Sequence, residues 1–378
     1  MKIVRRIFVG FTMMMVALLI ITTVTGNNYI YKALIYNYVD IDDYRLFSNS
    51  VVKAGTPQPW PLSASYNTIK PSAALQHELD SIKSVAFIVL KNDSICFEEY
   101  WENYGTESLS NSFSVAKSII GILVGIAMDE GHIKSLDEPI GDYIKDFKDP
   151  KMNTITIRNL LMMTSGSDWD ESYSGLMSQT TKGYYGTDLY SQVVSLSVQG
   201  NPGKSFSYRS GDTQLLSLVL KAATGNSVSE YASEKLWKPM GAEHDATWSL
   251  DHEGGIEKAY CCFNTNARDF ARIGDLYLHG GNWRGKQLVS EDYVRQSLAP
   301  VGLPDETGKE TNYYGYQWWL MPERGNNIFY ARGLNGQWII CVPDKHMVIV
   351  RLGHQRGPRM LNAYKEVYDM VDWAVANL

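Results

Sequence analysis

The run from Ser118 to Met128 is apolar at nearly every position, and Ser114 and Lys117 stand just before it. A helix of this composition has no polar face for water, so any fold of this chain has to enclose it on all sides. Because Ser114 and Lys117 are three residues apart, their side chains lie on one face of the first helical turn. The pattern therefore predicts a central buried helix that presents a serine and a lysine at the floor of a cleft.

A serine and a lysine placed in this way can perform acyl transfer without a Ser-His-Asp triad. A lysine kept neutral by burial accepts the serine proton, and the helix N-terminus favours negative charge on the attacking oxygen. Ser50 and Lys53 have the same spacing in a polar, turn-rich stretch. A helix cap followed by a surface lysine is the plainer interpretation of the spacing alone. The apolar run is what favours Ser114 over Ser50.

Two later segments carry further candidate residues. The loop over 202–212 delivers Tyr208 and Ser210 just before a predicted helix over 213–223. A lysine cation near Tyr208 would favour its phenolate, which makes this tyrosine a candidate general base. Farther along, residues 330–338 predict two strands joined at glycines, where the backbone can approach a substrate closely. Taken singly, these segments are also compatible with a packed loop aromatic and an ordinary hairpin turn.

In chain order, Ser-x-x-Lys at 114–117, Tyr-x-Ser at 208–210 and the strand motif Ala-Arg-Gly at 331–333 resemble the signature of the penicillin-recognising serine hydrolases. That family includes class C β-lactamases, DD-peptidases, family VIII esterases and aminohexanoate-dimer hydrolases. The segments 156–166 and 266–274 resemble two further stretches of the family, so the resemblance covers about residues 76–378. It implies an α+β fold, with an antiparallel sheet flanked by helices, a helical lobe over about residues 131–255, and the site between them.

Periodicity agrees with such a sheet. A hairpin is predicted over 84–91 and 95–101, and strands over 327–332, 337–342 and 347–352. A last amphipathic helix is predicted over 359–378. Strands at both ends of the domain, with helices between them, indicate one sheet that is closed by the terminal segments.

Within this resemblance we expect two-step acyl transfer through an acyl-enzyme, with the oxyanion held by backbone N–H groups. The expected residues are Ser114, Lys117 and Tyr208 for catalysis and Leu334, Gly333, Ser210 and Arg332 around the oxyanion and the substrate. Ser210 and Ala331 stand where β-lactamases of this type carry Asn and Lys or His, which argues against an efficient β-lactamase. The expected substrate is a small ester, an amide or a cell-wall peptide. No metal and no organic cofactor is implied.

Two other classes of function stay open at this point. A membrane-tethered receptor for cell-wall peptides or β-lactams would be acylated at the same serine and stop there, and no glutamate can be assigned from the sequence as a deacylating base. A pseudoenzyme would bind a partner through residues 168–188, a segment rich in Tyr, Gly, Ser and Thr that is predicted to be a loop over the cleft.

The composition and net charge limit which partners this chain can bind. The chain has 378 residues, 44% of them hydrophobic and 20% charged, which is a globular balance large enough for two lobes. A net charge of −6 without a basic stripe argues against a nucleic-acid partner. The cysteines form no disulfide framework, and because adjacent residues pair poorly, buried free thiols are expected; they are Cys96, Cys261, Cys262 and Cys341.

The N-terminal residues differ from the rest of the chain. Lys2, Arg5 and Arg6 precede an uncharged stretch from Ile7 to Val24, whose helical length of about 27 Å nearly matches a hydrocarbon core of roughly 30 Å. The stretch is longer than the roughly 7–15 apolar residues of a signal peptide. We therefore expect residues 1–26 to anchor the protein in the inner membrane, with the hydrolase domain outside the cytosol, in the periplasm. Secretion after signal cleavage is the alternative, and residues 27–75 are expected to be a spacer.

Overall fold

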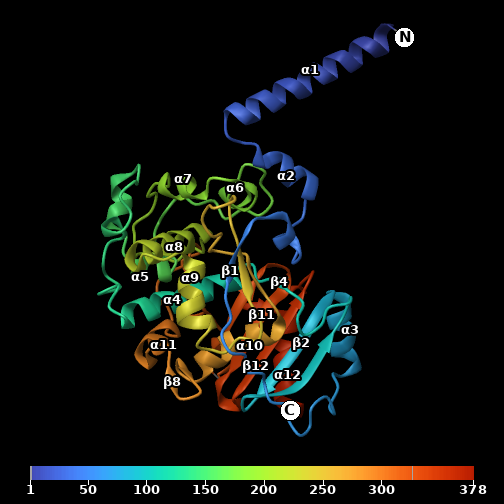
Figure 1. Cartoon of the computed structure of the whole chain (residues 1–378), viewed down its shortest axis with the longest axis vertical. Coiled ribbons are helices and arrows are strands. Elements are labelled where there is room, and N and C mark those ends of the chain that lie inside the picture. The colour runs from blue at the N-terminus through green and yellow to red at the C-terminus, as the bar shows by residue number, and fades with distance from the viewer. Residues whose placement is uncertain (1, 326) are drawn as a thin grey trace.

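The computed structural model describes residues 2–325 and 327–378, and its largest sheet is a six-stranded antiparallel one in the lower part of the view in Figure 1. Met1 of the expected anchor and Asn326 of the expected hydrolase domain lie outside the described residues. The strand order is β3-β2-β12-β11-β10-β9, with bounds β2 (Ser84–Lys91), β3 (Ser94–Tyr100), β9 (Trp319–Leu320), β10 (Phe329–Gly333), β11 (Gln337–Val342) and β12 (Met347–Gly353). Because β2 pairs with β12, the prediction of one sheet built from both ends of the domain is confirmed.

Helices cover both faces of this sheet. α10 (Ala267–Leu278) packs on β11 and β12 on one face, and α3 (Ala73–Ser81) and α12 (Lys365–Asn377) pack on the other. Strands buried on both sides are apolar at successive positions, and neighbouring side chains enter different cores. In β11, for example, Ile339 faces α10 and Ile340 faces α12. The last helix begins at Lys365, later than predicted, because β13 (Arg359–Met360) and β14 (Ala363–Tyr364) pair as a hairpin before it.

α4 (Val115–Asp129) is the predicted apolar helix, and it is buried from Val115 to Ala127. Gly125 lets a neighbouring ring approach it closely. A methyl group at Gly125 would lie 2.5 Å from the ring of Tyr293, whose hydroxyl donates to the Gly121 carbonyl at 2.7 Å. The helix is therefore enclosed on all sides, as its composition requires.

The other helices lie mostly around α4. Their bounds are α5 (Ile157–Leu161), α6 (Gln179–Tyr185), α7 (Leu189–Val194), α8 (Ser210–Thr224), α9 (Val228–Ala232) and α11 (Glu291–Ser297). α8 packs against both α4 and α5. The segment 168–188 contains α6, so the prediction of a loop there is only partly right.

Residues 27–75 are more structured than the sequence suggested. They include α2 (Tyr29–Tyr36) and β1 (Asn49–Val52). β1 is the edge of a second antiparallel sheet of order β1-β5-β6-β4, which also has β5 (Ala246–Ser249), β6 (Phe263–Thr265) and β4 (Ser110–Asn111). Two short strands, β7 (Asn282–Trp283) and β8 (Lys286–Gln287), pair as a separate hairpin. A four-residue strand is too short to show a period in sequence, which is why β1 was missed.

α1 (Lys2–Val24) projects away from the rest of the molecule (Figure 1). From Ile3 to Val24 it is long and apolar enough to cross a membrane, a test that a signal sequence near an N-terminus also passes.

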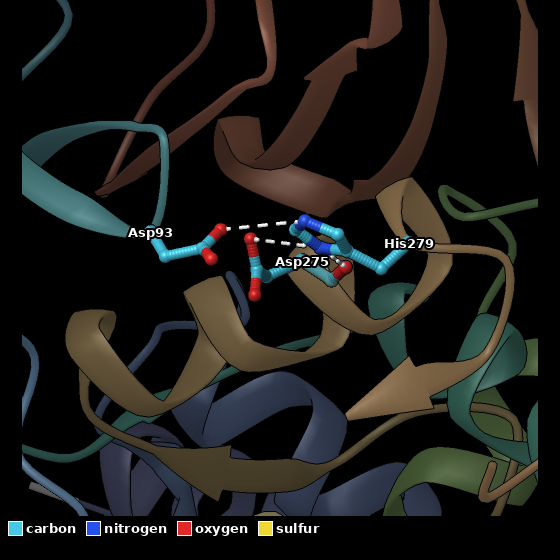
Figure 2. A group of neighbouring side chains, drawn as sticks. All are labelled: Asp93, Asp275 and His279. Atoms are coloured by element: carbon cyan, nitrogen blue, oxygen red, sulfur yellow. Dashed lines mark hydrogen bonds and ion pairs between the residues drawn. The ribbon is translucent and has the colours of Figure 1, made fainter. Parts of the chain in front are cut away.

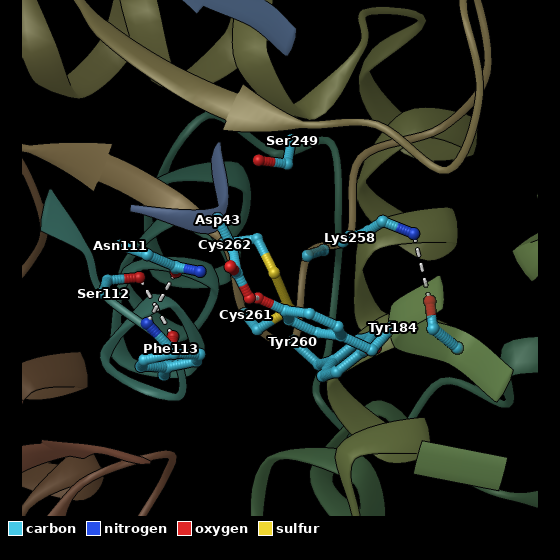
Figure 3. Close-up of a disulfide and its surroundings, with 12 residues drawn as sticks. Asp43, Asn111, Ser112, Phe113, Tyr184, Ser249, Lys258, Tyr260, Cys261 and Cys262 are labelled. Atoms are coloured by element: carbon cyan, nitrogen blue, oxygen red, sulfur yellow. Dashed lines mark hydrogen bonds between the residues drawn. A yellow bond between two sulfur atoms is a disulfide. The ribbon is translucent and has the colours of Figure 1, made fainter. Parts of the chain in front are cut away.

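The cysteine prediction was wrong for one pair. Cys261 and Cys262 form a disulfide (Figure 3), whereas Cys96 and Cys341 are free and buried as expected. Cys262 has a φ of 68°, so the chain turns between the two residues and does not continue in the extended alternation that would separate their side chains.

Candidate active site

Lys117 lies in the first turn of α4 and reaches back to Ser114, as its spacing predicts. Its Nζ donates to Ser114 Oγ at 2.9 Å, to Ser210 Oγ at 3.0 Å and to the Tyr260 carbonyl at 2.8 Å. These acceptors match the three donors of an ammonium group. The structure therefore brings Ser114, Lys117 and Ser210 together, and it adds a carbonyl from the residue before the disulfide.

Burial sets the charge state of Lys117. Only 1% of the side chain is exposed, and this burial lowers the Lys117 pKa to about 8, because an ammonium ion loses its hydration there. The negative charge of Glu171 raises this pKa and the positive charge of Arg332 lowers it, but burial is the largest effect. Near neutral pH, part of the Lys117 amine is therefore neutral and able to accept a proton.

Tyr208 lies against the same amine, with its ring centroid 5.2 Å from Lys117 Nζ. Burial, and then the charge of Glu171, raise the Tyr208 pKa above its usual value of about 10. Arg332 and a hydrogen bond with Ser114 lower the pKa, by less. The expectation that Tyr208 loses its proton more easily than a free phenol was therefore wrong, because desolvation outweighs the effect of the neighbouring positive charge. Tyr208 is a protonated phenol beside the nucleophile.

Glu171 is the residue that the sequence analysis missed. Its carboxylate accepts from the Ser210 backbone N–H at 2.6 Å and from Ser210 Oγ at 2.7 Å. Trp169 Nε1 and the Tyr173 hydroxyl also donate to it, at 2.9 and 2.6 Å. Since Lys117 donates to Ser210 Oγ, the Ser210 hydroxyl donates its own hydrogen bond to Glu171. A hydrogen-bonded chain thus runs from Lys117 through Ser210 to Glu171.

The sequence offers little to single out Glu171. It lies among several acidic residues in the segment 168–188, and no local period distinguishes it from them. The one usable signal was the prediction that this segment covers the cleft, which makes each of its carboxylates a candidate.

The end of β10 comes close to the start of α4. A methyl group at Gly333 would lie 2.2 Å from the Ser112 carbonyl oxygen, so only glycine permits this approach. Leu334 follows, and both Leu334 and Ser114 line a cavity of about 1070 Å³. Arg332 lies over the Trp319 ring at 3.5 Å from its centroid and 5.8 Å from that of Tyr208. Ala331, in contrast, is fully buried in the core.

A second cluster of ionisable groups joins the β2–β3 turn to α10 (Figure 2). Asp93, Asp275 and His279 offer ligand-type atoms that all lie within 4.8 Å of one another. His279 forms ion-pair contacts with Asp93 at 3.4 Å and with Asp275 at 3.6 Å, and burial raises the Asp275 pKa to about 7. Histidine–carboxylate pairing accounts for the cluster, and we assign no metal to it.

Comparisons with known proteins identify the family and the fold. A family profile described as Beta-lactamase matches residues 72–369. The chain is 28% identical over 301 residues to the 6-aminohexanoate-dimer hydrolase of Paenarthrobacter ureafaciens, covering 75% of this chain and 76% of that protein. A family VIII carboxylesterase structure is similar with a TM-score of 0.64 and 14% identity, over 82% of this chain and 99% of that one. A penicillin-binding protein structure from Bacillus halodurans is similar with a TM-score of 0.62 and 18% identity, over 80% of this chain and 100% of that one.

Proposed function

This chain belongs to the beta-lactamase family of serine hydrolases, and we propose that it hydrolyses an ester or amide through an acyl-enzyme on Ser114. One observation carries the assignment of residues. The amine of Lys117, with a pKa of about 8, is 2.9 Å from the Ser114 hydroxyl at the N-terminus of a buried helix. That pairing supplies a nucleophile with its base already in hydrogen-bond contact.

In the acylation step, neutral Lys117 accepts the Ser114 proton while Oγ attacks the carbonyl carbon. The electron pair of the carbonyl moves to its oxygen, which the backbone N–H groups of Ser114 and Leu334 stabilise together with the N-terminus of α4. The bond to the leaving group then breaks. The proton on Lys117 passes through the Tyr208 hydroxyl to that leaving alcohol or amine, so Tyr208 relays a proton and need not stand as a phenolate.

In the deacylation step, water attacks the ester carbon of the acyl-enzyme. Its proton enters the Tyr208 hydroxyl as the phenol proton moves to Lys117. When the bond between the acyl carbon and Ser114 Oγ breaks, that oxygen takes the proton back from Lys117, and the carboxylic acid leaves. Glu171 positions Ser210 and balances the charge that builds up on Lys117 during both steps.

The proposed substrates are small esters, amides or cell-wall peptides, and efficient β-lactam hydrolysis is not among the proposed activities. Ser210 is engaged between Lys117 and Glu171, and Ala331 has no charge to offer. We also propose that α1 anchors the protein in the membrane with the hydrolase domain outside the cytosol.

The test uses the full-length protein in detergent with p-nitrophenyl butyrate. Ser114→Ala should lower turnover by several orders of magnitude, because removal of the serine nucleophile lowers kcat by about 10⁶-fold in a triad enzyme. Ser50→Ala, at the serine with the same spacing to a lysine, is the matched control and should retain activity. A fluorophosphonate adduct should map to the Ser114 peptide by mass spectrometry. An adduct on Ser50 or Ser118 would refute the assignment, and stable labelling by a fluorescent penicillin without ester turnover would indicate a receptor.

A further inference from the structure

The outer wall of the active-site cavity is made by the residues that follow α1. Ala33, Leu34, Tyr38 and neighbouring residues up to Asp40 line the same cavity as Ser114. These residues lie before the stretch that matches the family, which starts at residue 72. The wall therefore lies outside the stretch that the family profile matches.

This wall is fastened across the cavity. The Asn335 side chain, next to the proposed oxyanion residue, donates to the Val39 carbonyl at 3.0 Å. His354 Nδ1 lies 3.0 Å from Asp40 Oδ1. On the helical side, the ring of Tyr36 stacks on Tyr185 of α6 with centroids 6.3 Å apart. The segment after α1 is thus held to both sides of the site.

Large apolar side chains stand exposed along the rim of the cavity. Leu34 is 58% exposed and Tyr38 is 83% exposed, although both line the cavity. Tyr173 and Leu176, from the segment 168–188, are exposed and line it too. Ile35 lies directly beside Leu34 and is 74% exposed. An apolar rim around a polar catalytic centre indicates a surface that binds an apolar ligand, another protein or a membrane.

α1 indicates what covers the rim. Only residues 25–28 separate α1 from α2, and four residues span at most about 14 Å. If α1 crosses a bilayer, α2 lies at the height of the headgroups, where tyrosine side chains concentrate. A small pocket beneath the end of α1 supports this placement, because it joins Thr25 and Gly26 to three lysines that would attract anionic headgroups; the lysines are Lys32, Lys148 and Lys182.

The cavity also has a charged part, lined by Lys83, Glu102 and His354. We propose that the rim docks on the bilayer and that the cavity takes from it an amphiphilic ester or amide with an aliphatic acyl chain. The carbonyl would reach Ser114, the chain would lie against Leu34 and Leu176, and the charged part would face a polar leaving group. This inference rests on the proposed hydrolase function and on the anchoring role of α1.

The experiment uses the full-length protein in phosphatidylcholine nanodiscs with p-nitrophenyl esters of two, four and eight carbons. Burial of a methylene is worth about fourfold in binding, so kcat/KM should rise at least tenfold from acetate to octanoate. Leu34→Ser and Leu176→Ser should each lower the octanoate-to-acetate ratio about tenfold. Leu62→Ser is the matched control, since Leu62 is 53% exposed and outside the cavity lining, and it should leave the ratio unchanged.

Docking is measured separately with a nitroxide on Ile35→Cys and, as control, on Leu62→Cys. The label at Ile35 should be shielded from a water-soluble nickel chelate and accessible to oxygen, and the label at Leu62 should show the reverse. Equal accessibility at the two sites would overturn the docking. A flat chain-length profile with Ser114-dependent turnover would overturn this inference and leave the proposed function standing. Absence of Ser114-dependent turnover for every ester would overturn both.

Discussion

The chemistry of Ser114 depends on the protonation state of one amine. In water Lys117 would be almost fully charged at neutral pH, since an unperturbed lysine has a pKa of about 10.4. Enclosure by α4, α8 and the Tyr260 carbonyl brings the Lys117 pKa to about 8. Two charges of opposite sign then adjust it, Glu171 upward and Arg332 downward. A single substitution at Glu171 or Arg332 can therefore lower or raise the Lys117 pKa.

Two substitutions should move the pH profile in opposite directions. Activity that needs neutral Lys117 rises as the pH passes its pKa of about 8. Glu171→Gln removes the charge that raises this pKa, so the rising limb of kcat/KM should move to lower pH. Arg332→Gln removes the charge that lowers it, so the limb should move to higher pH. The measurement is kcat/KM for p-nitrophenyl butyrate from pH 6 to 10. Shifts of the same sign, or none, would contradict the role given to Lys117.

The Tyr208 hydroxyl is tested by its removal. Tyr208→Phe keeps the ring and its packing, and loss of a proton relay should lower kcat by about 10²- to 10⁴-fold with a nearly unchanged melting temperature. Tyr190→Phe is the control, because its hydroxyl bonds to Asp146 at the surface. If Tyr208→Phe keeps most of the activity while Lys117→Ala is inactive, the Tyr208 hydroxyl is not a required proton relay and Lys117 transfers the protons alone.

At the scale of elements, the site exists because the end of β10 meets the start of α4. The strand's alternation decides which side chains are available there. Ala331 packs into the core that contains α4, while its neighbour Arg332 lies over Trp319. A basic residue one position along a strand faces the other way. Arg332 therefore acts on the site through its charge and does not substitute for a basic residue at position 331.

Gly333 sets how closely β10 approaches α4. Gly333→Ala would place a methyl group 2.2 Å from the Ser112 carbonyl, so the strand end and the Leu334 N–H should move away from Ser114. Loss of one oxyanion donor typically costs about 10²–10³ in kcat. Gly105→Ala is the control, because a methyl group there meets no heavy atom within 4 Å. Unchanged kcat for Gly333→Ala would show that this approach is not needed for oxyanion binding.

At the scale of the whole molecule, the cavity is assembled from both ends of the chain. It is lined by residues from the segments 33–40 and 173–185 and, from the C-terminal part, by Leu334, Asn335, His354 and Gln355. α1 alone takes little part, since it projects from the folded domain (Figure 1). An apolar helix of this length left in water would be unfavourable, which supports a lipid environment for it.

The anchor is tested in cells. If α1 stays attached, the protein should remain in the membrane fraction after a carbonate wash, and an alkaline phosphatase fusion at the C-terminus should be active. A fusion of the same reporter to a chain that starts at residue 27 should be inactive, because the reporter then stays in the cytosol. A soluble form beginning near Gly26 would show that the segment is a cleaved signal.

Local patterns in the sequence determined much of this protein. The apolar run after Lys117 required an enclosed helix, the spacing of Ser114 and Lys117 placed both on its first turn, and period-two segments indicated the strands of the central sheet. These features depend on neighbours within about one turn or one strand, so they can be recognised without a fold. The motifs in chain order then indicated the family.

Tertiary structure alone decided the rest. Glu171 reaches Ser210, the Tyr260 carbonyl reaches Lys117, and residues 33–40 close the cavity, each across a long sequence separation. The acidity of Tyr208 was misjudged because it depends on how much protein surrounds the phenol. The disulfide between Cys261 and Cys262 follows from a turn that no local pattern announced. Burial and long-range contact arise only when distant segments pack together, and they set the charge states on which the proposed chemistry depends.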